Sequence, residues 1–117
     1  MKTLAMIAVA LVALEHLYIL VLEMFFWDKP KGLRAFGMTQ EFATSTKALA
    51  ANQGLYNGFL AAGLAWGLAI ASAPVQIFFL LCVIVAGVFG AATAKLQILY
   101  IQAVPAAIAL ALVLFTR

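Results

Sequence analysis

Three ionisable side chains lie inside a long apolar stretch near the start of the sequence. Glu15 and His16 are adjacent near the middle of this stretch, which runs from about Thr3 to Trp27, and Glu23 lies closer to its end. A carboxylate or an imidazole can donate and accept protons in catalysis or transport. Because an ionisable group at the centre of a membrane helix costs about 2.5–3.5 kcal/mol, each one is a functional candidate by default.

A second group of polar residues lies at matching depths in later apolar stretches. Depth is counted from the cytoplasmic ends of antiparallel helices that rise about 1.5 Å per residue. On this count one level contains Glu23, Asn52, Gln53 and Gln102. Glu15, His16 and Asn57 fall at a deeper level. We therefore predict an intramembrane ligand-binding pocket lined by Glu15, His16, Glu23, Asn52, Gln53, Tyr56, Asn57 and Gln102, with Lys47 and Lys95 at its mouth.

Each of these residues also has a purely structural interpretation. Amides in membrane helices often only hydrogen-bond to a neighbouring helix, at about 0.6 kcal/mol on average. Glu23 can extend to the membrane interface, and Glu15 can pair with His16. The sequence indicates no metal site, because it has one histidine and one isolated cysteine, Cys82. No catalytic residue is identified.

The composition explains why such residues must be positioned by membrane helices. Apolar residue types make up 68% of the 117 residues and charged types 9%, whereas soluble domains carry roughly 25% charged residues. A soluble fold of this size could not hide so much apolar surface. The net charge of +3 comes from scattered basic residues rather than a patch, which argues against nucleic acid as a partner.

The apolar stretches predict an all-α integral membrane four-helix bundle as a single domain, residues 1–117. The four transmembrane helices are expected at about 3–27, 48–73, 75–93 and 96–115, each near the 20 residues that cross a bilayer. The last two connections are short, so neighbouring helices are antiparallel. In the long connection 28–47, Pro30 and Gly32 are expected to break the helix, and Thr39 is a candidate N-cap.

The basic residues predict the orientation in a bacterial inner membrane. The first and third connections carry five of them, Lys29, Lys31, Arg34, Lys47 and Lys95, and the opposite side carries only Lys2 and Arg117. By the positive-inside rule these two connections are cytoplasmic and both termini are outside.

Small residues and a proline predict close packing in the later helices. Gly54 and Gly58 have the spacing that lets membrane helices approach closely, as do Gly63 and Gly67. These contacts could form within the bundle or between the subunits of a homo-oligomer. Pro105 is expected to bend the last helix near Gln102 and to free a carbonyl near Ile101.

Two families resemble parts of the sequence. The segments ALEHLYILVLEMFFW (Ala13 to Trp27), NQGLYNGFLAAGL (Asn52 to Leu64) and QAVPA (Gln102 to Ala106) resemble a family of small four-helix bacterial membrane proteins classed as a domain of unknown function. This resemblance covers nearly the whole chain and implies a location and a size, but no activity.

The second resemblance is in architecture. KALAANQGLYNGFLA (Lys47 to Ala61) is similar to the second helix of the membrane-associated eicosanoid and glutathione metabolism family. That similarity implies four helices, external termini, trimers and glutathione as a candidate cofactor for lipophilic substrates. Asn52 and Tyr56 match that family's motif, whereas Ala48 and Leu55 stand where it has Arg and Glu.

Three functions follow as hypotheses. The first is binding or conversion of a small lipophilic ligand from the bilayer, with Glu15 or His16 as proton carrier. The second is a structural or accessory membrane subunit in which the polar residues only fix helix register. The third is a small proton-coupled transporter, for which a membrane-embedded glutamate is the main indication.

Overall fold

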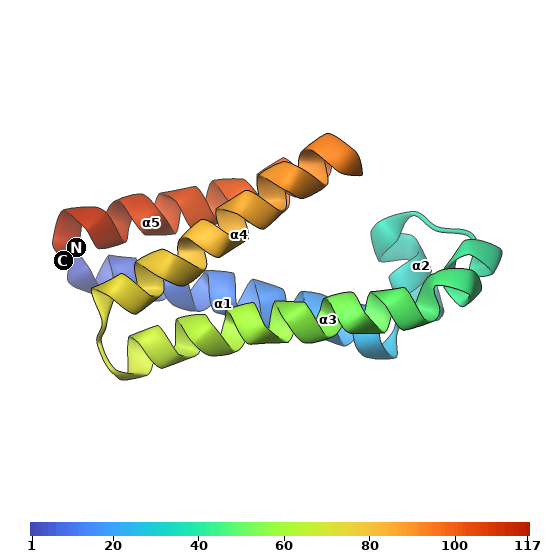
Figure 1. The fold of residues 1–117 in the computed structure, drawn as a ribbon, viewed down its shortest axis with the longest axis horizontal. Coiled ribbons are helices and arrows are strands. Elements are labelled where there is room, and N and C mark those ends of the chain that lie inside the picture. Colours follow the sequence, from blue (N-terminus) through green and yellow to red (C-terminus); the bar gives the residue numbers. More distant parts are fainter. The chain divides into compact units, whose positions relative to one another are not determined.

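The computed structural model describes all residues from Met1 to Arg117, and all its regular secondary structure is helical (Figure 1). The elements are α1 (Lys2–Phe25), α2 (Pro30–Phe36), α3 (Gln40–Ala69), α4 (Ala73–Thr93), the π-helix η1 (Leu99–Ala103) and α5 (Val104–Thr116). The all-α prediction is confirmed.

Three helical segments are long and apolar enough to cross a membrane: Lys2–Phe25, Ala73–Thr93 and Leu99–Thr116. At about 1.5 Å per residue, even the shortest approaches the roughly 30 Å thickness of a hydrocarbon core. The chain therefore has the character of a membrane protein. The predicted count of four is not confirmed, because α3 is long enough but carries too many polar residues, among them Asn52, Gln53 and Asn57.

The chain forms two compact units. The first unit comprises Met1–Leu14 and Leu60–Arg117, and the second comprises Glu15–Phe59. Both α1 and α3 contribute residues to each unit, and each unit is described separately below.

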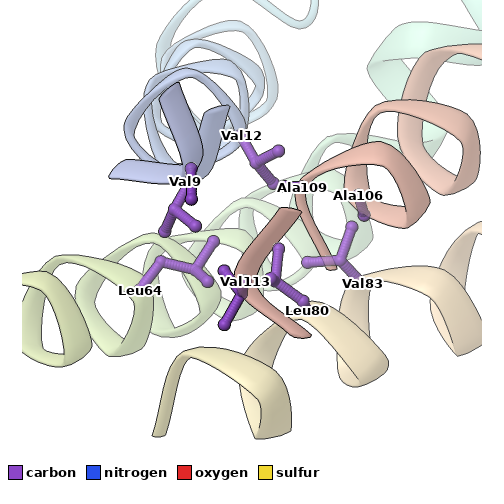
Figure 2. Packing of buried hydrophobic residues seen from close by; sticks show 9 residues of the cluster. Val9, Val12, Leu64, Leu80, Val83, Ala106, Ala109 and Val113 are labelled. Atoms are coloured by element: carbon purple, nitrogen blue, oxygen red, sulfur yellow. The ribbon is translucent and has the colours of Figure 1, made fainter. Parts of the chain in front are cut away.

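The core of the first unit takes side chains from α1, α3, α4 and α5. Figure 2 shows these residues converging, with Val9 and Val12 on α1, Leu64 on α3, Leu80 and Val83 on α4, and Ala106, Ala109 and Val113 on α5. Burial of such residues cannot use the hydrophobic effect against lipid tails, so tight packing of small and branched side chains holds these helices together.

Close helix approach in the first unit depends on glycine. A Cβ added at Gly87 on α4 would lie 2.9 Å from the backbone nitrogen of Ala103, at the end of η1. Pro105 lies two residues after Ala103, in the first turn of α5. Since proline has no N–H and crowds the carbonyl four residues earlier, the π-helical turn is where the chain absorbs this lost hydrogen bond, as expected for a proline at this point.

The connection in the second unit contains a short helix that the sequence did not predict. Pro30 lies in the first turn of α2, where its missing N–H costs nothing, and Gly32 is buried within that helix. The prediction that these two residues only interrupt the helix was therefore incomplete. Thr39 caps α3 as predicted, because its hydroxyl oxygen accepts a hydrogen bond from the Phe42 N–H at 3.2 Å.

Candidate functional site

Seven of the eight predicted site residues belong to the second unit. Within it, α1 and α3 approach closely at Gly54, where a Cβ would lie 3.2 Å from both the Glu23 Cβ and the Leu20 carbonyl oxygen. One turn further along α3, a Cβ at Gly58 would meet only the Leu20 Cδ1 methyl, at 2.7 Å. The Gly54 and Gly58 spacing therefore serves a contact within the chain.

This close approach joins two predicted site residues on different helices. The Asn57 side-chain N–H of α3 donates a hydrogen bond to Glu23 Oε1 of α1, with 2.6 Å between the heavy atoms. Both side chains are partly buried. The pair is the best defined polar contact among the predicted residues.

The second pair, Glu15 and His16, is adjacent in sequence and less closely associated. His16 Nδ1 lies 3.9 Å from Glu15 Oε1, beyond hydrogen-bond distance. The His16 side chain is fully buried, whereas the Glu15 side chain is 28% exposed. Of the two, Glu15 is therefore the side chain that a ligand or a water molecule can reach.

The other predicted site residues of α3 are exposed polar side chains. Asn52, Gln53 and Tyr56 are all exposed, and Gln53 precedes Asn57 by one helical turn, so these two lie on one side of α3. The predicted eighth member, Gln102, lies in the first unit, on η1, and is partly exposed. Its membership of the site stays a prediction.

Polar contacts also fix the chain where α1 ends. The Trp27 indole N–H donates to the Thr46 hydroxyl at 3.0 Å, and its ring packs against Phe36 with 4.9 Å between centroids. Lys47, predicted at the mouth of the pocket, forms a salt bridge to Asp28 at 3.2 Å. The hydrogen bond from Lys47 lowers the pKa of the Asp28 carboxyl below its ordinary value, because it stabilises the carboxylate.

No three side chains of the types that hold metal ions come together in the structure. The polar atoms at the Glu23 and Asn57 pair are carboxylate and amide groups. Such groups bind a ligand by hydrogen bonds, and the carboxylate can also exchange a proton.

Sequence reasoning missed one buried polar residue, Gln76 at the start of α4. Its side-chain N–H donates to the carbonyl oxygen of Gly67 at 3.0 Å, and only 8% of the residue is exposed. Gln76 also borders a cavity of about 230 Å³ in the first unit, together with Lys2 and Arg117. In the sequence, Gln76 could have been identified only by its position as the one amide in an otherwise apolar helix.

Comparison with known proteins places the chain among relatives without an assigned activity. A family model described as "Protein of unknown function (DUF1304)" matches residues 10–114. An uncharacterised protein of Lactococcus lactis subsp. lactis (strain IL1403), YpaA, is 34% identical over 106 residues, which cover 87% of this chain and 89% of that protein. No solved structure matches the chain.

Proposed function

Because the chain belongs to the DUF1304 family, for which no function is known, we propose from its own geometry that it is a small polytopic membrane protein that binds a small lipophilic ligand. The binding site is the polar region of α1 and α3 around Glu23 and Asn57. The ligand enters from the bilayer and presents a hydrogen-bonding end to this region.

The hydrogen bond between Glu23 and Asn57 is the observation that carries this proposal. A carboxyl group inside an apolar helix is costly, and the 2.6 Å bond from Asn57 holds one of its oxygens in a fixed position. The other oxygen and the Asn57 carbonyl oxygen are left to bind a ligand. The site thus combines a proton-exchanging group with an amide, on two helices locked together at Gly54.

The exposed amides beside this pair support the same interpretation. The side chains of Asn52 and Gln53 are exposed and make no hydrogen bond within the chain. Polar groups near the hydrocarbon region need partners, because lipid tails offer none. A ligand with hydroxyl, carbonyl or carboxyl groups would satisfy Gln53 together with Glu23. Glu15, partly exposed beside His16, is proposed as a proton carrier at the deeper level.

The proposed setting is a four-span bundle in a bacterial inner membrane, with α3 as the fourth crossing. An even number of crossings returns both ends of a chain to one side. Lys2 and Arg117 line one cavity, which supports this count, and Figure 1 draws the two ends next to each other. The basic residues of the first and third connections support a cytoplasmic location for these two connections, with both termini outside.

Single cysteines introduced into a Cys82→Ser background test this topology in intact cells. Arg34→Cys is expected to resist a membrane-impermeant maleimide until the cells are opened. Ala71→Cys, in the connection between α3 and α4, is expected to react at once. The reverse labelling would invert the proposed orientation, and equal labelling from outside would remove α3 as a crossing.

Ligand binding is tested on the full chain purified in detergent. Native mass spectrometry of the protein from its membrane, followed by a thermal-shift screen of isoprenoid, fatty acid and quinone compounds, is expected to find a stabilising ligand. Asn57→Ala and Glu23→Gln should each abolish that stabilisation, whereas Gln97→Ala, which removes an exposed amide elsewhere, should keep it. If no compound binds, or if all three variants respond like the wild type, the proposal is wrong.

A structural or accessory role is the second candidate, and the same bond favours it. Asn57 already satisfies one oxygen of Glu23, much as Gln76 satisfies the Gly67 carbonyl, so both contacts could serve only to fix helix register. This role predicts that Asn57→Ala lowers the stability of the protein without changing the binding of any small molecule.

A further inference from the structure

The basic residues of the second unit gather around α2. Lys29, Lys31 and Arg34 are all exposed and lie within six residues of one another. None of them forms a salt bridge, whereas Lys47 is paired with Asp28. Three positive charges without a salt-bridge partner are thus presented beside the end of an apolar helix, although Lys29 lies near enough to Asp28 to stabilise its carboxylate.

The fold holds these charges in place. A Cβ at Gly32 would collide with the carbonyl oxygens of Phe26 and Trp27, so α2 lies directly against the end of α1. Phe36, in the last turn of α2, packs on the Trp27 ring. Gly37 ends the helix with φ 62°, a conformation that favours glycine. The cations therefore do not lie on a free loop.

Two aromatic rings lie beneath the Lys31 amine and indicate what kind of ligand it could contact. Its Nζ lies 5.6 Å from the centroid of the Tyr18 ring and 5.9 Å from that of Phe26. Tyr18 lies about two turns before the end of α1 and Phe26 directly follows its last residue, and they are 52% and 38% exposed. The amine is thus held over two rings on the open side of an apolar helix, within the distance of a cation–π contact.

A cation above exposed aromatic rings at the end of a membrane helix matches the two parts of a phospholipid. A phosphate pairs with the amine, and the upper acyl chain packs on the rings. Trp27 lies at the same end of α1, and tryptophan favours the level of lipid headgroups. Basic clusters next to a membrane helix attract anionic lipids.

We propose that α2 and the end of α1 form a binding site for the headgroup of an anionic phospholipid. Lys31 contacts the phosphate from its position over Tyr18 and Phe26, and Lys29 and Arg34 surround it. The site needs only that α1 enters the membrane. It is independent of the proposed ligand at Glu23 and Asn57 and of the direction in which the chain is inserted.

The experiment compares the full chain in nanodiscs of phosphatidylcholine containing either phosphatidylglycerol or no anionic lipid. Native mass spectrometry of protein released from the mixed nanodiscs counts the retained phosphatidylglycerol molecules. Each of Lys29→Gln, Lys31→Gln and Arg34→Gln is expected to weaken retention about fivefold, and the triple variant by more than 50-fold. The matched control Lys2→Gln removes one charge from the first unit and should have little effect.

Two additional measurements separate a lipid site from a simpler attraction. Tyr18→Leu keeps an apolar side chain and all charges, so a loss of several-fold in retention would indicate that the ring helps to hold Lys31. Inorganic phosphate at constant ionic strength should not displace the lipid, since it lacks the acyl chains. The proposal is overturned if the triple variant retains phosphatidylglycerol like the wild type, or if Lys2→Gln loses as much. Should the triple variant fail to purify, the three single variants decide the outcome.

Discussion

Replacing Gly54 by alanine should separate α1 from α3 and weaken the Glu23–Asn57 pair. The new Cβ would lie 2.5 Å from Met24 Cγ and 3.2 Å from both the Glu23 Cβ and the Leu20 carbonyl oxygen. Ordinary carbon contacts are 3.5–4.0 Å, and neither a backbone carbonyl nor a Cβ can move without its helix. Overpacking of this kind costs about 1–3 kcal/mol. Stretching the bond to Asn57 adds roughly 0.6 kcal/mol.

The neighbouring glycine gives a matched control. A Cβ at Gly58 meets only the Leu20 Cδ1 methyl, at 2.7 Å, which is the far end of a flexible side chain. A change of rotamer relieves that contact for about 0.5–1.5 kcal/mol. The gain from replacing a helical glycine by alanine, about 0.5–1 kcal/mol, is common to both variants. Gly54→Ala should therefore be the less stable of the two by about 1–2 kcal/mol.

The assay is reversible unfolding in mixed micelles, with increasing dodecyl sulfate and far-ultraviolet circular dichroism as the signal. The midpoint of Gly54→Ala should fall well below that of Gly58→Ala, which should stay near the wild type. Equal midpoints for the two variants, or a wild-type midpoint for Gly54→Ala, would refute the close approach of α1 and α3 at this residue.

Three further predictions concern polar side chains. In a double-mutant cycle of Glu23→Gln and Asn57→Ala, the coupling free energy from the same unfolding assay should be about 0.6–1.7 kcal/mol, and additive effects would exclude the bond. Because Lys47 lowers the pKa of Asp28 in the folded state, their contact stabilises the protein above the unfolded-state pKa and is lost as the pH falls through the folded-state value. Lys47→Met should raise the Asp28 pKa in a carboxyl carbon NMR titration, and an unchanged pKa would contradict the pairing. Gln76→Leu should destabilise the protein by about 1 kcal/mol in the micelle assay, since the Gly67 carbonyl loses one of its two donors and keeps only the Ser72 N–H, and a stabilised variant would show that the amide is dispensable.

Much of the helical architecture could be predicted because its determinants are local. Thr39 caps α3 through its own hydroxyl, and Pro105 follows a disturbed helical turn because a proline preceded by helix removes a hydrogen bond to that turn. The short helix α2 could not be predicted in this way. Pro30 and Gly32 usually interrupt helices, and the close contact of Gly32 with the chain at the end of α1 is a tertiary feature that the sequence does not reveal.

Less of the candidate site could be predicted from the sequence. Depth along the helices placed Glu23 at the level of Asn52 and Gln53, and it placed Asn57 deeper, with Glu15 and His16. The structure instead bonds Asn57 to Glu23, where α1 and α3 approach closely at Gly54. The depth count also could not show that Asn57 is partly buried and Asn52 exposed, because burial depends on which side of α3 faces α1. Gln76 was missed because a single amide in an apolar helix gives no periodic signal.

The amides of α3 differ in what each can contribute to the proposed ligand site. Asn57 faces α1 and has given one donor to Glu23, so it can only add to a site that already contains the carboxyl group. Gln53 lies one turn away on the same side and is exposed, which leaves its donors and acceptor available. In the proposed site, a ligand at Glu23 is therefore expected to contact Gln53, whereas a ligand held by Asn52 alone would not touch the carboxyl group. Gln53→Leu should consequently weaken binding of a stabilising compound more than Asn52→Leu in the thermal-shift assay, and the opposite order would move the site to another face of α3.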